Sequence, residues 1–250
     1  MGSRCNAETR SSLAKEPGQT MTEDKSAIRH AATVIVLRDR ATNPRVLMGQ
    51  RGAGAAFMPN KFVFPGGAVD ADDSAIPLAK PLVQTCHARL LEDNSGPSPE
   101  TLAVAAIREL WEETGLILGA PEEWQDAPKD WSGFAKAGFR PSAEKMYFFF
   151  RAITPPGPPR RFDARFFLVD ADQLAGDLDD FSGASDELSH LQWVPLDEAR
   201  ALNLPFITSI VLGELAALRE IQPPASVPFF KNQDEESLFL RLNGSEQQYQ

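Results

Sequence analysis

Cysteine and histidine are scarce in this chain of 250 residues, which contains two cysteines and three histidines. So few of these residues cannot build a disulfide framework or a zinc cluster, and Cys5 and Cys86 are typical of a reducing, cytoplasmic protein. Basic residues are outnumbered, since 25 Lys and Arg face 35 Asp and Glu and give a formal net charge of −10. That charge argues against a nucleic-acid polymer or an anionic membrane surface as partner. The sequence also lacks any run of about 18 uncharged apolar residues, which a membrane span requires.

The order of apolar and polar segments predicts an α/β domain, a mixed sheet with helices packed on it. We expect a disordered leader over 1–26, the domain over 27–223 and a C-terminal extension over 224–250. Apolar and β-branched runs predict strands at 31–37, 45–51, 62–64, 145–154, 161–169 and 191–194, with one or two short strands within 227–242. Helical spacing predicts helices at 78–91, 98–114, 197–203 and 206–221.

The helix over 98–114 has the strongest boundary signals. Ser98 is a good N-cap, Pro99 suits the first helical position, and Gly115 follows the last turn. With about 100° of rotation per residue, the apolar side chains of this helix share one face. The opposite face carries three carboxylates within one turn, at Glu109, Glu112 and Glu113.

Like charges at this spacing repel each other, and a bound cation would turn the repulsion into attraction. Carboxylate oxygens without nearby His or Cys favour Mg²⁺ or Mn²⁺, and Arg108 can hold one carboxylate through a forked hydrogen-bonded pair. The alternative interpretation is a solvated acidic face. Two further features favour the metal site: Gly66 and Gly67 end an upstream strand, and Glu100 opens the helix.

Residues 108–117 resemble the second half of a Nudix box, whose pattern is G-x5-E-x7-R-E-U-x-E-E-x-G-U with U aliphatic. Seven residues separate Glu100 from Arg108, as the pattern requires, and the box glycine would be Gly67. The gap between Gly67 and Glu100 holds 32 residues instead of five, which is an insertion of 27 placed over 71–97. A split box of this kind, and the flanking residues 46–70, resemble the coenzyme A diphosphatase branch of the Nudix superfamily.

This resemblance implies a Nudix α/β/α sandwich, with the mixed sheet between helices and an insertion inside the box. Glu112 and Glu113 would be the main metal ligands, with Glu109 and the backbone carbonyl of Gly67. Arg108 and Glu100 would orient this set.

A separate carboxylate would act as general base in such an enzyme, and Glu187 lies in a family-like position before the Trp193-Val194-Pro195-Leu196 segment. An exposed loop acid is an equally weighted alternative for Glu187. Asp186 and Glu109 are competitors for the role of base.

Three arginines are candidate contacts to substrate phosphates. Arg161 and Arg165 share one side of their strand with Asp163, and the alternative there, slightly favoured, is a solvated strand face with an internal Arg-Asp-Arg ladder. Arg51 is the third, with a strand-end surface charge as its alternative. The insertion is expected near the mouth of the site, where Lys80, His87 and Arg89 could meet an anionic substrate.

The resulting functional hypothesis is metal-dependent hydrolysis of a nucleoside diphosphate linked to another moiety, with coenzyme A or acyl-coenzyme A preferred. The alternatives are a Nudix pyrophosphatase acting on NADH, ADP-ribose or another nucleotide derivative, and a Nudix-fold nucleotide-binding regulatory module without turnover. Some Nudix enzymes are homodimers, so the apolar helix over 206–221 is open to two roles, in the core or in a dimer interface.

Overall fold

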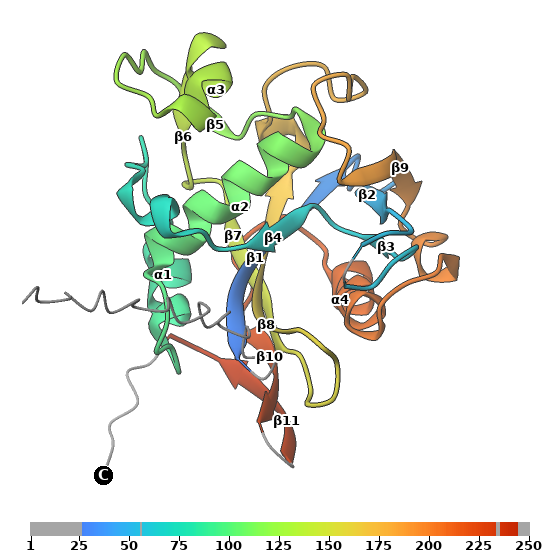
Figure 1. The fold of residues 1–250 in the computed structure, drawn as a ribbon. Coiled ribbons are helices and arrows are strands. Elements are labelled where there is room, and N and C mark those ends of the chain that lie inside the picture. The colour runs from blue at the N-terminus through green and yellow to red at the C-terminus, as the bar shows by residue number, and fades with distance from the viewer. Residues whose placement is uncertain (1–26, 56, 234–235, 245–250) are drawn as a thin grey trace, which may run out of the picture.

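The computed structural model describes residues 27–55, 57–233 and 236–244. The leader predicted over 1–26 lies outside the described residues. Within them, one large sheet runs through the molecule, and helices lie on both of its faces (Figure 1).

The large sheet is mixed, as expected. Its strand order is β11-β10-β7-β8-β1-β2-β3, with β4 paired to β1 and β9 paired to β2. The pairs β1–β8 and β7–β10 are parallel, and the other pairs are antiparallel. The strands are β1 (Ile28–Arg38), β2 (Arg45–Arg51), β3 (Phe62–Val63), β4 (Gly66–Ala68), β7 (Tyr147–Ile153), β8 (Arg161–Asp170), β9 (Leu188–Pro195), β10 (Val227–Gln233) and β11 (Glu236–Leu242).

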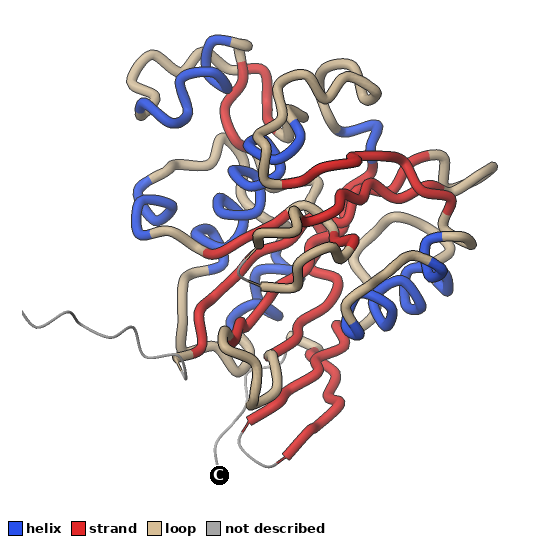
Figure 2. Tube along the Cα trace, turned by 45° about the vertical axis from the view of Figure 1, so that its right-hand side comes forward, coloured by secondary structure: helices blue, strands red, loops and turns tan. Residues whose placement is uncertain are grey.

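The helices and a small second sheet surround this core sheet, as Figure 2 shows by colour. The helices are α1 (Gln84–Leu91), α2 (Pro99–Thr114), α3 (Ser132–Lys136) and α4 (Phe206–Ala217), with 3₁₀ turns η1 (Ala71–Ala75), η2 (Lys129–Trp131), η3 (Ala171–Gln173) and η4 (Ala199–Ala201). Strands β5 (Gly119–Pro121) and β6 (Phe139–Pro141) form the two-stranded sheet.

Two apolar cores lie on the two faces of the large sheet. Alternate residues of β1 point to opposite sides, so Val34 and Val36 pack with α1 and α2, while Ile35 and Leu37 pack with α4. Helix α4 therefore covers the sheet face opposite α2 (Figure 1). This arrangement confirms the predicted α/β/α sandwich with its mixed sheet between helices.

The capping signals of α2 act as predicted. The Ser98 hydroxyl accepts a hydrogen bond from the Thr101 amide at 3.2 Å, and Gly115 ends the helix with a left-handed φ of 77°. The helix is buried along most of its length, and Glu109 and Glu113 are buried with it. The interpretation of this helix as carrying a solvated acidic face is therefore wrong.

Three predicted helices have different bounds in the structure. Instead of a helix over 78–91, α1 begins at Gln84, because residues 79–80 hydrogen-bond with residues 141 and 143 and Lys80 forms an isolated bridge with Ser142. The helix predicted over 197–203 is only the short turn η4. The Asn203 carbonyl instead accepts a hydrogen bond from the Phe62 amide at 2.9 Å.

Helix α4 is shorter than the predicted 206–221 and ends at Ala217. The chain becomes extended at Leu218, and Leu218 and Ile221 turn onto the apolar core beneath the helix. Val211, Leu212 and Leu215 are fully buried in that core, so this face of α4 serves the fold.

Residues 224–250, treated above as an extension, contribute β10 and β11 to the same large sheet (Figure 1). Strand β10 pairs with β7 and buries Val227 and Phe229 in the core on the α2 side. Across residues 27–55, 57–233 and 236–244, no helix is long and apolar enough to cross a membrane.

Candidate active site

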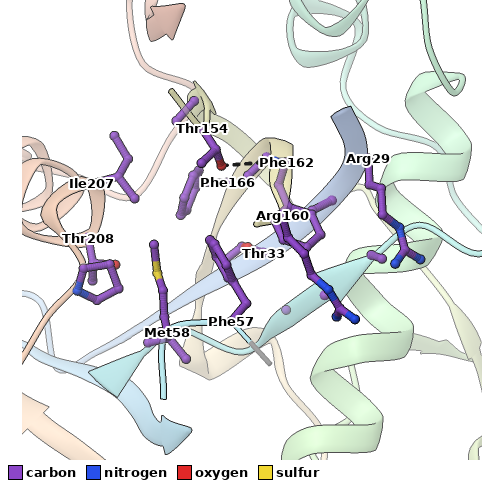
Figure 3. A pocket seen from close by; sticks show the side chains of 18 of the residues that line it. Arg29, Thr33, Phe57, Met58, Thr154, Arg160, Phe162, Phe166, Ile207 and Thr208 are labelled. Atoms are coloured by element: carbon purple, nitrogen blue, oxygen red, sulfur yellow. Dashed lines mark hydrogen bonds between the residues drawn. The ribbon is translucent and has the colours of Figure 1, made fainter. Parts of the chain in front are cut away.

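A cavity of about 730 Å³ opens at the large sheet and reaches from α2 to the start of α4. Residues of β1, β4, β8 and β10 contribute to its walls. Figure 3 shows Arg29 and Arg160 at one end of the view and Ile207 and Thr208 at the other, with Phe57 between them. The cavity therefore combines a charged region with an apolar one.

The predicted carboxylates of α2 lie at this cavity. Glu109 and Glu112 line it, whereas Glu113 is only 2% exposed and accepts a hydrogen bond from the Gly66 amide at 2.7 Å. Arg108 also lines the cavity, and its Nη1 donates to Glu109 Oε1 at 2.9 Å and to Glu112 Oε2 at 3.1 Å. The charged wall is thus a linked set of one guanidinium and two carboxylates.

The two glycines of β4 let the chain pass close to these glutamates. A Cβ on Gly67 would lie 2.5 to 2.6 Å from the carboxylate atoms of Glu109. A Cβ on Gly66, whose φ is 152°, would meet the backbone of Ala32 and Thr33. Only glycine fits at either position without displacing a neighbour.

Burial raises the pKa values of the glutamates. It raises the pKa of Glu113 to about 8, against the opposing effect of the Gly66 hydrogen bond. It raises the pKa of Glu109 to about 7, although Arg108 favours the charged form. The pKa of Glu112 is raised in the same way, by burial first. Each shift reflects a negative charge that is poorly solvated, a condition that a bound cation would relieve.

The chemistry of these donors fits a hard divalent cation, since all of them are carboxylate oxygens. However, among the described residues, no three His, Cys, Asp or Glu side chains converge to hold a metal ion. Glu109 and Glu112 are engaged by Arg108, and Glu113 by the Gly66 amide. Each of these bonds engages one oxygen of its carboxylate, so a cation would bind through the other oxygen of each group.

The structure separates Glu100 from the residues it was predicted to orient. Its carboxylate lies 3.1 Å from His87 Nε2, and its side chain is 45% exposed. Arg108 instead pairs with Asp73, whose two carboxylate oxygens accept bonds from Nε at 2.8 Å and from Nη2 at 3.1 Å. Asp73 was not among the residues singled out from the sequence.

Glu187 is exposed and lines the cavity, and its charge is close enough to raise the pKa values of Glu109 and Glu113. Its loop is tied to the end of α2 by a hydrogen bond of 2.8 Å from the Ser185 amide to the Glu112 carbonyl. Asp186 is exposed next to it and is not among the cavity-lining residues.

The three predicted phosphate contacts have different positions. Arg51 lines the cavity, its charge lowers the pKa of Glu113, and its buried Nε has no hydrogen-bond partner among the described residues. Arg161 donates instead to the carbonyls of Thr154 and Asn232.

Arg165 is 1% exposed and lies 2.9 Å from Asp163 Oδ2, which Arg151 also contacts at 2.7 Å. The predicted ladder of Arg161, Asp163 and Arg165 on a solvated face is therefore wrong in part, because the cluster is buried and Arg151 takes the place of Arg161. The cluster holds the insertion through bonds to the Asp93 carbonyl and to the Asn94 side chain. The opposite face of β8, which carries Phe162, Ala164 and Phe166, lines the cavity.

The basic residues of the insertion bind parts of the protein itself. Lys80 pairs with Glu144 at 2.7 Å, His87 with Glu100 at 3.1 Å, and Arg89 donates to the carbonyls of residues 224 and 225. None of these three lines the cavity. The contribution of segment 71–97 to the site comes from its first turn, which carries Asp73.

Several cavity residues were missed in the sequence. Arg29 precedes the apolar run of β1, and Arg160 follows a proline-rich turn, one position before the arginine that was predicted. Phe57 and Phe162 form an edge-to-face pair with centroids 5.1 Å apart. The available signal was the alternation of β8, which places Phe162 and Arg161 on opposite faces but does not say which face is hollow.

Fold and site together define an α/β/α protein whose glutamate-bearing helix forms one wall of a large cavity. The family described as "NUDIX domain" matches residues 97–211. A Caenorhabditis elegans protein named "Putative nudix hydrolase 7" is 31% identical over 193 residues, which is 70% of this chain and 56% of that protein. This chain thus spans little more than half the length of that relative.

Of two similar solved structures, one has a TM-score above 0.5 and the other has a TM-score below it. The NUDIX hydrolase from Alicyclobacillus acidocaldarius has a TM-score of 0.59 and 27% identity, covering 78% of this chain and 93% of that one. A MutT protein from Bacillus halodurans has a TM-score of 0.43 and 16% identity, covering 84% and 95%. The sequence and the fold of this chain are thus similar to those of Nudix proteins.

Proposed function

We propose that this protein hydrolyses a diphosphate linkage in a nucleotide derivative with the aid of a divalent cation. The observation that carries the proposal is the wall of the cavity on which Arg108 holds Glu109 and Glu112. The similarity of the chain to Nudix hydrolases supports the same activity. A cation such as Mg²⁺ or Mn²⁺, bound among these glutamates and the Gly67 carbonyl, would polarise the diphosphate and lower the pKa of a water molecule.

The residues around this wall suggest how the reaction is organised. Arg51 would bind a phosphate oxygen through its guanidinium, and Arg160 would bind another at the rim. Glu187, exposed at the cavity, would accept a proton from the attacking water. The water oxygen forms a bond to one phosphorus, the bridging P–O bond breaks, and the two phosphorylated fragments leave.

Coenzyme A or an acyl-coenzyme A is the proposed substrate. The split box supports it, and so does the cavity, because phosphate-binding arginines share it with apolar side chains such as Phe57, Phe162 and Ile207. A substrate that is anionic at its diphosphate and bulky at its far end suits such a lining. Hydrolysis would yield 3′,5′-ADP and a phosphopantetheine species.

A substrate panel with product identification tests the proposal. Coenzyme A, an acyl-coenzyme A, NADH, ADP-ribose, a nucleotide sugar and an 8-oxo nucleotide are incubated with the protein and either Mg²⁺ or Mn²⁺, and products are identified by mass spectrometry. Fastest turnover is expected for the coenzyme A compounds. Faster cleavage of another member would reassign the substrate, and no cleavage of any member would contradict the hydrolase proposal.

Two glutamate variants distinguish turnover by this protein from turnover by a contaminating hydrolase. Glu112→Gln removes a carboxylate of the cavity wall and should reduce kcat by several orders of magnitude. Glu198→Gln is the matched control, because Glu198 is exposed and its side chain makes no capping bond at η4. Equal rates in both variants would mean that the α2 glutamates do not carry the reaction.

A further inference from the structure

Arg108 is the central connection of the site, and its hydrogen bonds divide between two groups. Its Nη1 reaches Glu109 and Glu112 on its own helix. Its Nε and Nη2 bind both carboxylate oxygens of Asp73, and Nη2 also donates to the Ala68 carbonyl at 3.0 Å. Most of the guanidinium is therefore held from the side of η1, which leaves one nitrogen for the two glutamates.

The Asp73 carboxylate is also held by a contact within its own turn. It is 2% exposed, and its Oδ2 accepts a hydrogen bond from the Asp70 amide at 2.7 Å. That bond closes the first turn of η1, which follows β4 directly. A buried, bidentate Asp–Arg pair of this kind has a defined orientation, unlike an exposed ion pair.

Glu100 is too far along α2 to perform this task in the present fold. It lies eight positions before Arg108 on the helix, a rise of about 12 Å at about 1.5 Å per residue. Its carboxylate is half-exposed and lies beside His87. The structure gives it no contact with Arg108, Glu109 or Glu112 among the described residues.

The spacing of the sequence agrees with the contacts of Asp73. Five residues lie between Gly67 and Asp73, as the box pattern requires between its glycine and its first acid. The interval of 34 residues then falls between Asp73 and Arg108, where the pattern has seven. The inserted segment again amounts to 27 residues, but it follows the first acid of the box instead of preceding it. The acid is an aspartate, where the pattern has glutamate.

We propose that Asp73 is the positioning residue of this site, and that it holds Arg108 in the place from which Arg108 orients Glu109 and Glu112. The split of the Nudix box then lies after position 73, so η1 belongs to the site and only the later part of segment 71–97 is inserted. Glu100 has no part in positioning. The inference rests on the proposed function, because it assigns Asp73 a task in that same site.

Removing the Asp73 charge has two consequences for a cation at the site. The local negative charge falls, and Arg108 becomes free to bind Glu109 and Glu112 more fully. Both effects make the glutamates poorer ligands. In Asp73→Asn the affinity for Mn²⁺ should therefore fall at least tenfold, and kcat should fall with it. KM at saturating Mn²⁺ should change less than threefold, because Asp73 does not line the cavity.

The test measures Mn²⁺ binding and turnover separately in four proteins: wild type, Asp73→Asn, Asp73→Glu and Glu100→Gln. Free Mn²⁺ is followed by electron paramagnetic resonance without substrate, and folding is checked by thermal melting in EDTA. Asp73→Glu keeps the charge but moves the guanidinium, so its affinity should lie between those of wild type and Asp73→Asn. Glu100→Gln should match wild type.

Asp73→Asn with the Mn²⁺ affinity and kcat of wild type would overturn the inference, as would a loss confined to Glu100→Gln. If Asp73→Asn does not fold, Asp73→Glu decides, and a Mn²⁺ affinity within twofold of wild type is the contrary result. If wild type hydrolyses none of the panel but Asp73→Asn still loses Mn²⁺ affinity, the proposed function fails while the positioning role stands.

Discussion

The Gly66 amide donates a 2.7 Å hydrogen bond to Oε2 of Glu113, and this bond is the one polar contact that the structure gives the Glu113 carboxylate among the described residues. Glu113 is 2% exposed, and burial raises its pKa to about 8. One hydrogen bond therefore does not compensate for the solvation that the ionised carboxylate loses on folding. Burial of the ionised Glu113 carboxylate thus destabilises the metal-free protein, and a bound cation would remove this destabilisation.

Glu113→Gln should stabilise the metal-free protein and inactivate it. The amide oxygen can still accept from Gly66, while no charge has to be buried at pH 8. A gain of about 1 kcal/mol would raise Tm by roughly 2–4 °C in a protein of this size. Melting in EDTA at pH 8 measures the first effect and turnover the second. Glu198→Gln, an exposed control, should leave both unchanged, and a lower Tm for Glu113→Gln would contradict this account.

The stability of the metal-free protein should fall as the pH rises from about 6.5 to about 8. In the folded state Glu109 and Glu113 keep their protons up to about 7 and about 8, whereas the ordinary value in an unfolded chain is 4.5. The native state thus binds more protons in this window, and the free energy of unfolding decreases as they are released. The lowered pKa of His30 has the opposite sign, but it acts below its ordinary value of 6.5.

Melting curves in EDTA across this pH window test that dependence. Excess Mn²⁺ should raise Tm most at the upper end, because metal and proton compete for the same carboxylates. Glu113→Gln should flatten the EDTA curve. A Tm that increases with pH in EDTA would show that these glutamates are not the groups that set the dependence.

Local signals predicted most of the fold. Strand β2 has the bounds expected from sequence, and Ser98 and Gly115 bound α2 as their residue types indicate. The helix expected over 197–203 does not form, because tertiary hydrogen bonds hold its last residue. Asn203 bonds with residues in and next to β3. Such a contact leaves no local pattern.

The site was predictable where it depends on one helix, and less so where it depends on packing. Helical spacing brings Glu109 and Glu112 to one wall, as the structure shows. Alternation along β8 divides Arg161 from Phe162, but the choice of the face that lines the cavity depends on which helices cover the sheet. Asp73 illustrates a third case. The sequence shows its spacing from Gly67, but its partner Arg108 lies 35 positions away, and no local pattern links the two.

Gly67→Ala should disable the site without unfolding the protein. The added Cβ would lie about 2.5 Å from the Glu109 carboxylate, so that side chain must move. We expect kcat and Mn²⁺ affinity to fall at least about tenfold, an effect of about 1.4 kcal/mol or more. Gly54→Ala is the matched control, since a Cβ there meets nothing within 4 Å. Unchanged turnover in Gly67→Ala would mean that Glu109 is not needed at its present position.

Arg160 and Arg161 are neighbours in sequence with different surroundings, and they test whether the cavity described here binds the substrate. Arg160 is exposed at the rim of the cavity, so Arg160→Ala should raise KM by about threefold to tenfold, as expected for a partly solvated contact to phosphate. Arg161 bonds with the carbonyls of Thr154 and Asn232, so Arg161→Ala should lower Tm and leave KM unchanged. Steady-state kinetics with melting in parallel distinguishes the two. The reverse pattern, with KM sensitive to Arg161 alone, would place substrate phosphates on the other face of β8, beside the buried Asp163 cluster, and would exclude this cavity as their site.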